Sequence, residues 1–248
     1  MATQSDLIQE RLPHNEELLL LGVTGSTAYG LAHEGSDEDR LGLYAVPTTT
    51  VLGFGFDSKK ASRVWTQPED VQLHEIQKFL ALMLQGNPTI TELLFLDEYE
   101  FLDPAITELI TERSRLLGAH GIRNRYMGYA VSQAKRLQRR EGEGKKGFAS
   151  DLGHRTAKHG RHCFRLLIQA EQLLATGSLS VNVSDRRDEL FEIGSLAESD
   201  VDAFVDRFEI EKDRVENLDS TLPDQPDVAW AESWLINFRN ERWERVNG

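Results

Sequence analysis

The stretch that decides the fold is Gly25–Gly30, which reads GSTAYG, followed five residues later by Ser36–Asp39, which reads SDED. An apolar run at Leu18–Val23 precedes the Gly-Ser turn and predicts a buried strand. At such a turn, where a helix begins, free backbone N–H groups can hold phosphate. If the second stretch is extended, Asp37 and Asp39 point to the same side. Two carboxylates facing a phosphate-binding turn suit Mg²⁺-dependent phosphoryl or nucleotidyl transfer, because the carboxylates hold the metal and the metal neutralises phosphate oxygens.

Composition limits the classes of protein to consider. The chain has 248 residues, of which 40% are hydrophobic, and this is enough for one large or two modest domains. No apolar run approaches the roughly 20 residues that span a bilayer, and the first residues lack the pattern of a secretory signal, so we expect no membrane partner. The single cysteine, Cys163, excludes an intrachain disulfide and favours a cytoplasmic setting with the thiol buried and inert.

Charge is distributed unevenly along the chain. The formal net charge is −13, which disfavours nonspecific binding of nucleic acid by the molecule as a whole. Residues 135–165, however, hold ten basic residues against three acidic ones. Such a basic segment suggests a polyanionic ligand, either a nucleoside triphosphate or a nucleic-acid end. A solvated helix face that balances neighbouring acids explains the segment about equally well.

The order of the elements predicts two parts. The first part reads as mixed α/β, with strands expected at 18–23, 38–46, 63–66 and 70–74, and helices at 27–32, 76–86, 89–95 and 102–117. The second part reads as almost all helix, with helices expected at 124–140, 150–176, 199–218 and 228–242. We place the boundary so that residues 1–118 and 119–248 form the two domains.

The joint pattern GSxxxG, five residues, SDxD resembles the signature of the DNA polymerase β-like nucleotidyltransferase superfamily. Within it, the chain is similar to the predicted nucleotidyltransferases of the RNA-repair-associated branch, which carry a GSxAYG…SDxD pattern. Further runs are similar too and extend the resemblance over about residues 16–240, namely Lys78–Leu80, Gln85–Thr89, Glu92–Leu94, Lys158–Leu167 and Leu222–Asp227.

The resemblance implies an α/β fold with a polymerase β-like nucleotidyltransferase core, a mixed sheet with flanking helices, followed by an all-helical domain. It implies metal-dependent transfer of a nucleoside monophosphate from an NTP such as ATP to an acceptor hydroxyl, with release of pyrophosphate. The cofactor would be Mg²⁺ or Mn²⁺, and an RNA end is one candidate acceptor. Relatives use a third carboxylate besides Asp37 and Asp39. Asp70 is our choice, since it opens an alternating strand, and Glu75 at the strand-to-helix junction is the rival.

The same resemblance suggests which residues bind the nucleotide. Gly25 and Ser26 would hold the triphosphate, and a basic helical stripe would face the cleft. Tyr29, Ser36 and Asn87 lie in matching motifs, and Asn87 also suits a helix cap. The full expected set is Gly25, Ser26, Tyr29, Ser36, Asn87, Lys158, His162 and Arg165.

One departure and two alternatives stay open. Relatives often carry SDxDxRG, whereas here Arg40 directly follows Asp39, which on a strand turns the arginine to the opposite face. The chain could instead be a catalytically inactive module that binds a nucleotide or nucleic acid, or a nucleotidylating toxin–antitoxin component. The intact Asp37, Asp39 and Asp70 argue against the first, and the large helical part argues against the second. The acceptor, the preferred base and the oligomeric state are not encoded in any motif.

Overall fold

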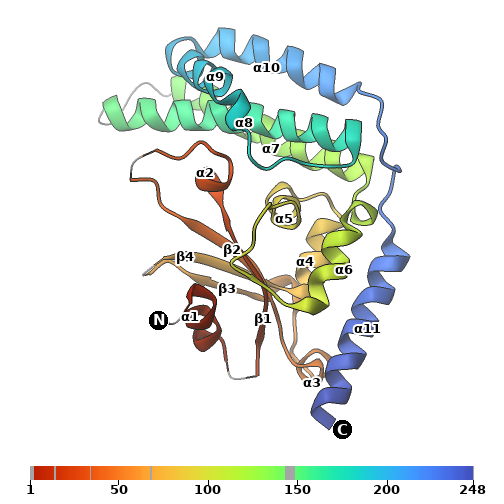
Figure 1. The fold of residues 1–248 in the computed structure, drawn as a ribbon. Coiled ribbons are helices and arrows are strands. Elements are labelled where there is room, and N and C mark those ends of the chain that lie inside the picture. The colour runs from red at the N-terminus through yellow and green to blue at the C-terminus, as the bar shows by residue number, and fades with distance from the viewer. Residues whose placement is uncertain (1–2, 14, 34, 68, 143–148, 248) are drawn as a thin grey trace.

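Five strands form a mixed sheet with the order β3-β4-β2-β1-β5 (Figure 1). Their bounds are β1 Glu17–Thr24, β2 Asp39–Ala45, β3 Ser62–Trp65, β4 Asp70–Glu75 and β5 Phe101–Leu102. β2 and β4 run parallel, and the other neighbours pair antiparallel. The computed structural model describes residues 3–13, 15–33, 35–67, 69–142 and 149–247, with the backbone alone at 139–142, 149–155 and 244–247.

The four predicted strands are confirmed as β1 to β4, each within one residue at either end. The prediction of one helix over 102–117 is wrong at its start, where Phe101 and Leu102 form β5 against Leu20 and Leu21 of β1. The rest of that range holds three short helical pieces, η2 Pro104–Ile106, α6 Thr107–Thr111 and η3 Arg113–Leu116. The Asp103 carboxylate accepts a hydrogen bond from the Ala105 N–H at 2.8 Å, so helical structure begins only after Asp103.

The helix after the Gly-Ser turn is shorter and earlier than predicted. α2 covers only Gly25–Ala28, whereas the sequence predicted a helix at 27–32. Gly30 has φ +67° and ends the helix in a left-handed conformation. The Leu31 N–H then donates to the Ser26 carbonyl at 2.9 Å, which closes the turn. The chain is thereby redirected toward Ser36 and Asp37.

Helices pack on the sheet and above it (Figure 1). The predicted helices at 76–86 and 89–95 are confirmed as α4 Ile76–Met83 and α5 Pro88–Leu94. Above them lies a helical layer of α7 Ala119–Gly142, α8 Ala149–Thr176, α9 Arg187–Ser199 and α10 Val201–Glu216. Phe164 of α8 meets Phe204 and Phe208 of α10 with ring centroids 5.7 and 6.3 Å apart. These aromatic contacts hold the layer together.

Three α-helices and two 3₁₀ helices of the described residues were not predicted, namely α1 Gln4–Arg11, α3 Thr48–Leu52, α9, η1 Ser58–Lys60 and η4 Ser184–Arg186. α9 is held by Leu190, Ile193 and Ala197, which are buried at helical spacing. Among the described residues, no helix combines the length and apolarity that crossing a bilayer would demand.

The last helix, α11 Val228–Asn247, runs back alongside the first part of the chain, near α3 (Figure 1). Its Arg239 pairs with buried Glu75 and donates to the Val46 carbonyl at 2.8 Å. One hydrophobic cluster includes Leu19 of β1 as well as Phe208 of α10. α7 begins at Ala119, next to the expected boundary, but the division into domains 1–118 and 119–248 stays a prediction.

Candidate active site

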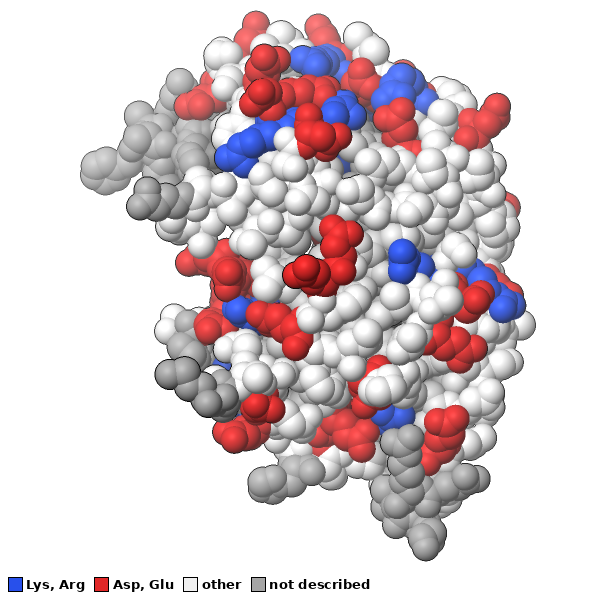
Figure 2. All heavy atoms as spheres, in the orientation of Figure 1, with Lys and Arg blue, Asp and Glu red and all other residues white. Residues whose placement is uncertain are grey.

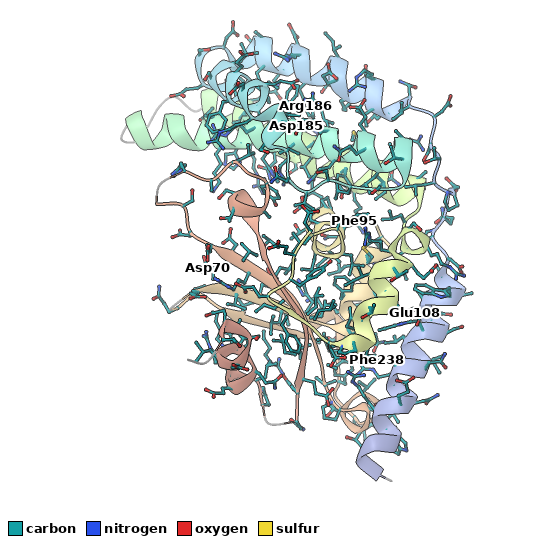
Figure 3. The ribbon with its side chains drawn as sticks, in the orientation of Figure 1. Asp70, Phe95, Glu108, Asp185, Arg186 and Phe238 are labelled. Carbon is teal, nitrogen blue, oxygen red and sulfur yellow. The ribbon has the colours of Figure 1, made fainter. Side chains whose placement is uncertain are left out.

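Two of the predicted carboxylates lie side by side at the end of the sheet where strands β2 and β4 begin. Asp39 is the first residue of β2 and Asp70 the first of β4, and the parallel register makes them direct partners. Register partners on adjacent strands project to the same face, so both carboxylates leave the sheet together. Figure 3 labels Asp70 at the left-hand end of the sheet, below the helical layer, and Figure 2 shows acidic side chains gathered at that edge.

The electrostatics of Asp39 connect it to the other expected groups. Partial burial raises the pKa of Asp39, and the nearby carboxylates of Asp70 and Asp37 raise it further, while Lys158 lowers it. Asp37 itself lies just before β2, because the strand begins at Asp39 and not at 38 as expected. Asp37 therefore approaches Asp39 through an irregular segment rather than by strand alternation.

The Gly-Ser turn is held against the Asp39 carboxylate. Gly25 has φ +69°, a conformation that favours glycine. A Cβ placed on Gly25 would overlap Asp39 Oδ2 and lie 3.3 Å from Asp39 Cγ. Thr24 is the antiparallel partner of Asp39, so β1 delivers the turn directly to the carboxylate. The close approach explains why this position carries a glycine.

A pocket of about 350 Å³ opens at this place. It is bounded by the turn on one side and by β3 on the other, with Asp39 and Asp70 between them. The lining residues are Thr24, Gly25, Tyr29, Asp39, Arg40, Leu41, Val64, Trp65, Thr66, Asp70, Val71, Gln72 and Thr89. The sequence prediction thus contributes Gly25, Tyr29, Asp39 and Asp70 to one cavity.

The other residues expected near the nucleotide are placed as follows. The Ser36 hydroxyl accepts from the His33 N–H at 3.0 Å and shapes the loop before Asp37. Asn87 caps α5, because its Oδ1 accepts from the Ile90 N–H at 3.3 Å. Ser26 is the second residue of α2. Ser26, Ser36 and Asn87 do not line the described pocket, and their contact with a nucleotide stays a prediction.

The basic stripe expected on α8, formed by Lys158, His162 and Arg165, contains one exposed residue and two that are engaged within the protein. Lys158 is exposed and acts electrostatically on Asp39. Arg165 is buried with 3% exposure, forms an ion pair with Glu92 and lies 3.7 Å above the Tyr29 ring. Its Nη2 donates to His162 Nδ1 at 3.0 Å, and burial lowers the pKa of His162 to about 3. His162 is therefore neutral, and Arg165 is occupied by protein groups instead of facing solvent.

Glu92 has a role that was not predicted from the sequence. Its Oε2 accepts from the Tyr29 hydroxyl at 2.7 Å while Oε1 pairs with Arg165. Glu92 joins α5, α8 and the turn that follows α2. The matching ELL run at 92–94 was a signal for this position, but nothing in the sequence identified its partners.

The rival third carboxylate, Glu75, has a different function in the structure. It is fully buried, its side chain accepts from the Gln77 N–H at 2.8 Å, and it pairs with Arg239. It lies at the far end of β4 from Asp70. These contacts favour Asp70 as the third carboxylate.

The basic segment 135–165 is described only in part. Lys135, Arg136 and Lys158 are exposed. Arg161 stacks on the Phe191 ring at 4.5 Å. The side chains of Arg139, Arg140, Lys145, Lys146 and Arg155 lie outside the described part of the chain.

The chemistry of the donor set suits a hard divalent cation. Asp37, Asp39 and Asp70 offer carboxylate oxygens only, as Mg²⁺ and Mn²⁺ prefer. Within the described ranges, no three His, Cys, Asp or Glu side chains are grouped closely enough to hold a metal ion by themselves. Mg²⁺ is commonly bound by one or two carboxylates together with substrate phosphates and water, so the residues fit a cation that arrives with a nucleotide.

Known proteins resemble this chain at the level of family and of fold. The model of the RlaP family, described as the RNA repair pathway DNA polymerase beta family, matches residues 3–235. Among solved structures, the chain is similar to a nucleotidyltransferase-like protein from Exiguobacterium sibiricum, at 14% identity and a TM-score of 0.29, over 86% of this chain and 73% of that one. Likeness at this level supports no argument about the site. No curated protein matches the chain.

Proposed function

The chain belongs to the RNA repair pathway DNA polymerase beta family and is a nucleotidyltransferase, and we propose that it moves a nucleoside monophosphate from an NTP to an acceptor hydroxyl, releasing pyrophosphate. ATP is the proposed donor and an RNA end the proposed acceptor. The acceptor is supported by the description of the family and by the exposed Lys135 and Arg136. A cytoplasmic setting fits the buried thiol of Cys163.

Each side chain has a distinct part in the proposed reaction. Asp37, Asp39 and Asp70 would hold Mg²⁺ or Mn²⁺, and the bound cation would neutralise charge on the reacting phosphate. The Gly25–Ser26 backbone binds the triphosphate through N–H groups of the turn, and α2 is too short to add a large helix dipole. Lys158 adds a positive charge on the same side. Asp70 lies across Asp39 from the turn, where it can accept the hydrogen bond of the attacking hydroxyl.

One observation supports this proposal more than any other. Asp39 and Asp70 are register partners at the starts of two parallel strands, and the Gly25 turn lies directly against Asp39. A turn with free N–H groups beside two neighbouring carboxylates suits the binding of a metal-bound triphosphate. We propose that the NTP lies on the β1 side of Asp39 and the acceptor hydroxyl on the β4 side, which the position of β2 between β1 and β4 supports.

The test is transfer of label from α-labelled NTPs to RNA, DNA, protein and small-molecule acceptors, with Mg²⁺ or Mn²⁺. We expect Asp37→Asn, Asp39→Asn and Asp70→Asn each to lower transfer by about 10²-fold or more, since metal stabilisation of the transition state supplies several kcal/mol. Asp206→Asn, an exposed change on α10, is the matched control and should behave as wild type.

The outcomes separate the candidate functions. Transfer within tenfold of wild type in Asp39→Asn contradicts the proposal. NTP binding without transfer to any acceptor identifies an inactive binding module. Label found only on a protein partner identifies the toxin–antitoxin type of activity.

A further inference from the structure

Arg40 lies directly beside the carboxylates but points away from them. It is the second residue of β2, so its side chain leaves the strand on the face opposite to Asp39. The side chain is only 8% exposed. On that face it meets three carboxylates, with Arg40 nitrogens 3.0 Å from Glu38, 2.9 Å from Glu69 and 2.9 Å from Glu100.

The three acids lie on three separate segments, which lead into β2, β4 and β5 at the same end of the sheet. Glu38 stands between Asp37 and Asp39, and Glu69 immediately precedes Asp70. Glu100 immediately precedes β5, and its N–H donates to the Leu21 carbonyl of β1 at 2.9 Å. One guanidinium therefore connects the segments that carry all three candidate metal ligands.

Different nitrogens of the Arg40 guanidinium contact different glutamates. Nε and Nη2 both donate to Glu100, at 2.9 to 3.2 Å, which is the two-pronged geometry that guanidinium favours. Nη1 lies 2.9 Å from Glu69, which also accepts from Gln4 Nε2 of α1 at 2.5 Å. α1 covers this face of the sheet, since its Ile8 packs in one cluster with Tyr44 and Val71. The Arg40 guanidinium is thus held by acidic groups on the face of the sheet opposite to the Asp39 side chain.

Without a cation at this place, the three glutamates would repel one another. That repulsion would act on Glu38 and Glu69, the direct neighbours of Asp39 and Asp70, and would favour a wider separation of the two segments. A lysine provides a single point charge and cannot satisfy three carboxylates in the same planar arrangement.

We propose that Arg40 is a positioning residue that fixes the spacing between the Asp37–Asp39 segment and Asp70, and so presets these carboxylates for a divalent cation. The inference rests on the proposed function. It accounts for the arginine that directly follows the second aspartate in this chain. An arginine at this position of β2 points to the face opposite to Asp39, where it contacts Glu38, Glu69 and Glu100.

The test is a titration with Mn²⁺, followed by the electron paramagnetic resonance signal of free Mn²⁺, with a saturating non-hydrolysable ATP analogue present. Simple electrostatics predicts that Arg40→Gln binds Mn²⁺ more tightly, because a positive charge near the site is removed. The positioning role predicts the opposite sign, a Mn²⁺ affinity about 10- to 100-fold weaker, the range seen when residues that orient metal ligands are lost. Arg40→Lys, which keeps the charge, should also bind Mn²⁺ more weakly.

Arg63→Gln is the matched control. Arg63 also lies on this face of the sheet and pairs with buried Glu16, but at a distance from Asp39 and Asp70 along the strands. We expect it to keep the Mn²⁺ affinity of wild type. If Arg40→Gln does not fold, Glu69→Gln replaces it, because the Glu69 side chain is 37% exposed, against 8% for Arg40.

The two proposals fail in different ways. If wild-type protein binds Mn²⁺ and Asp39→Asn does not, the metal site stands on its own. In that case, unchanged or tighter Mn²⁺ binding in Arg40→Gln overturns the positioning role alone. Where Glu69→Gln is used in its place, unchanged Mn²⁺ binding has the same meaning. Wild-type protein that binds no Mn²⁺ with the analogue overturns both.

Discussion

Gly25 is the single residue at which the backbone conformation of the turn and the position of the Asp39 carboxylate depend on each other most directly. It has a left-handed conformation, and a Cβ at this position would overlap the Asp39 carboxylate. A Gly-Ser turn before an SDxD stretch is readable in the sequence, because the order and spacing of those residues are local. That the carboxylate of Asp39 occupies the space of the missing side chain could not be read from the sequence, since it depends on the register of β1 against β2.

We expect Gly25→Ala to weaken binding of a metal–nucleotide complex strongly. The alanine Cβ must displace the Asp39 carboxylate, and the left-handed conformation adds about 1–2 kcal/mol of strain for a residue other than glycine. The measurement is the affinity for a non-hydrolysable ATP analogue with Mn²⁺, alongside the thermal midpoint. Gly55→Ala is the matched control, because Gly55 also has positive φ but nothing lies within 4 Å of its Cβ position. Equal nucleotide affinity in the two variants would assign the Gly25 turn a structural role only.

Elements are connected by pairs that lie far apart in the sequence. Strand and helix periodicity predicted most elements, but β5 was missed because two residues have no readable period. Arg165 was expected to contact phosphate from its place on a basic helical stripe. Its actual partner, Glu92, lies 73 residues away on α5, and no local pattern indicates which of many acids a buried arginine will choose.

The pairing of Glu92 with Arg165 can be tested by a double-mutant cycle. Glu92→Gln should lower the free energy of unfolding by about 3–5 kcal/mol, because it leaves the buried Arg165 charge without its counterion. Arg165→Met in the Glu92→Gln background should recover much of that loss, so the two changes are strongly non-additive. Urea denaturation of the two single variants and the double variant measures the coupling. Additive losses would show that Glu92 and Arg165 stabilise the protein independently.

At the scale of the whole molecule, the last helix is part of the support for the first strands. α11 places Arg239 on Glu75 and Arg242 2.9 Å from Glu17. The sequence predicted α11 as a helix but not where it would pack, because its buried arginines read as ordinary surface charges. The change from mixed α/β to helix near residue 118 is visible in the sequence, whereas the return of the chain end to the sheet is not.

We therefore expect residues 1–118 expressed alone not to unfold cooperatively. Glu75 would remain as a buried carboxylate without Arg239, and the apolar cluster shared with the helical layer would be exposed. Calorimetry and urea titration of this fragment, compared with the full chain, provide the measurement. A cooperative transition with the native stability of the full chain would show that the first part is an independent domain.

The overall charge of −13 bears on the proposed RNA acceptor. An acidic molecule repels a polyanion except where cations are gathered, so an RNA end should bind along the exposed basic residues of α7 and α8. Binding should then weaken with salt with a log–log slope of about −0.7 per phosphate contacted on a single strand.

Replacing Lys135 and Arg136 together by Ala should flatten this slope and leave NTP affinity unchanged, because both residues are exposed on α7 and neither lines the pocket. Fluorescence anisotropy of a short labelled RNA from low to high salt measures the slope, and replacing exposed Lys59 and Lys60 provides a control of equal charge. Affinity that does not depend on salt, or an absence of RNA binding at low salt, would remove RNA as acceptor and leave a protein or small-molecule hydroxyl.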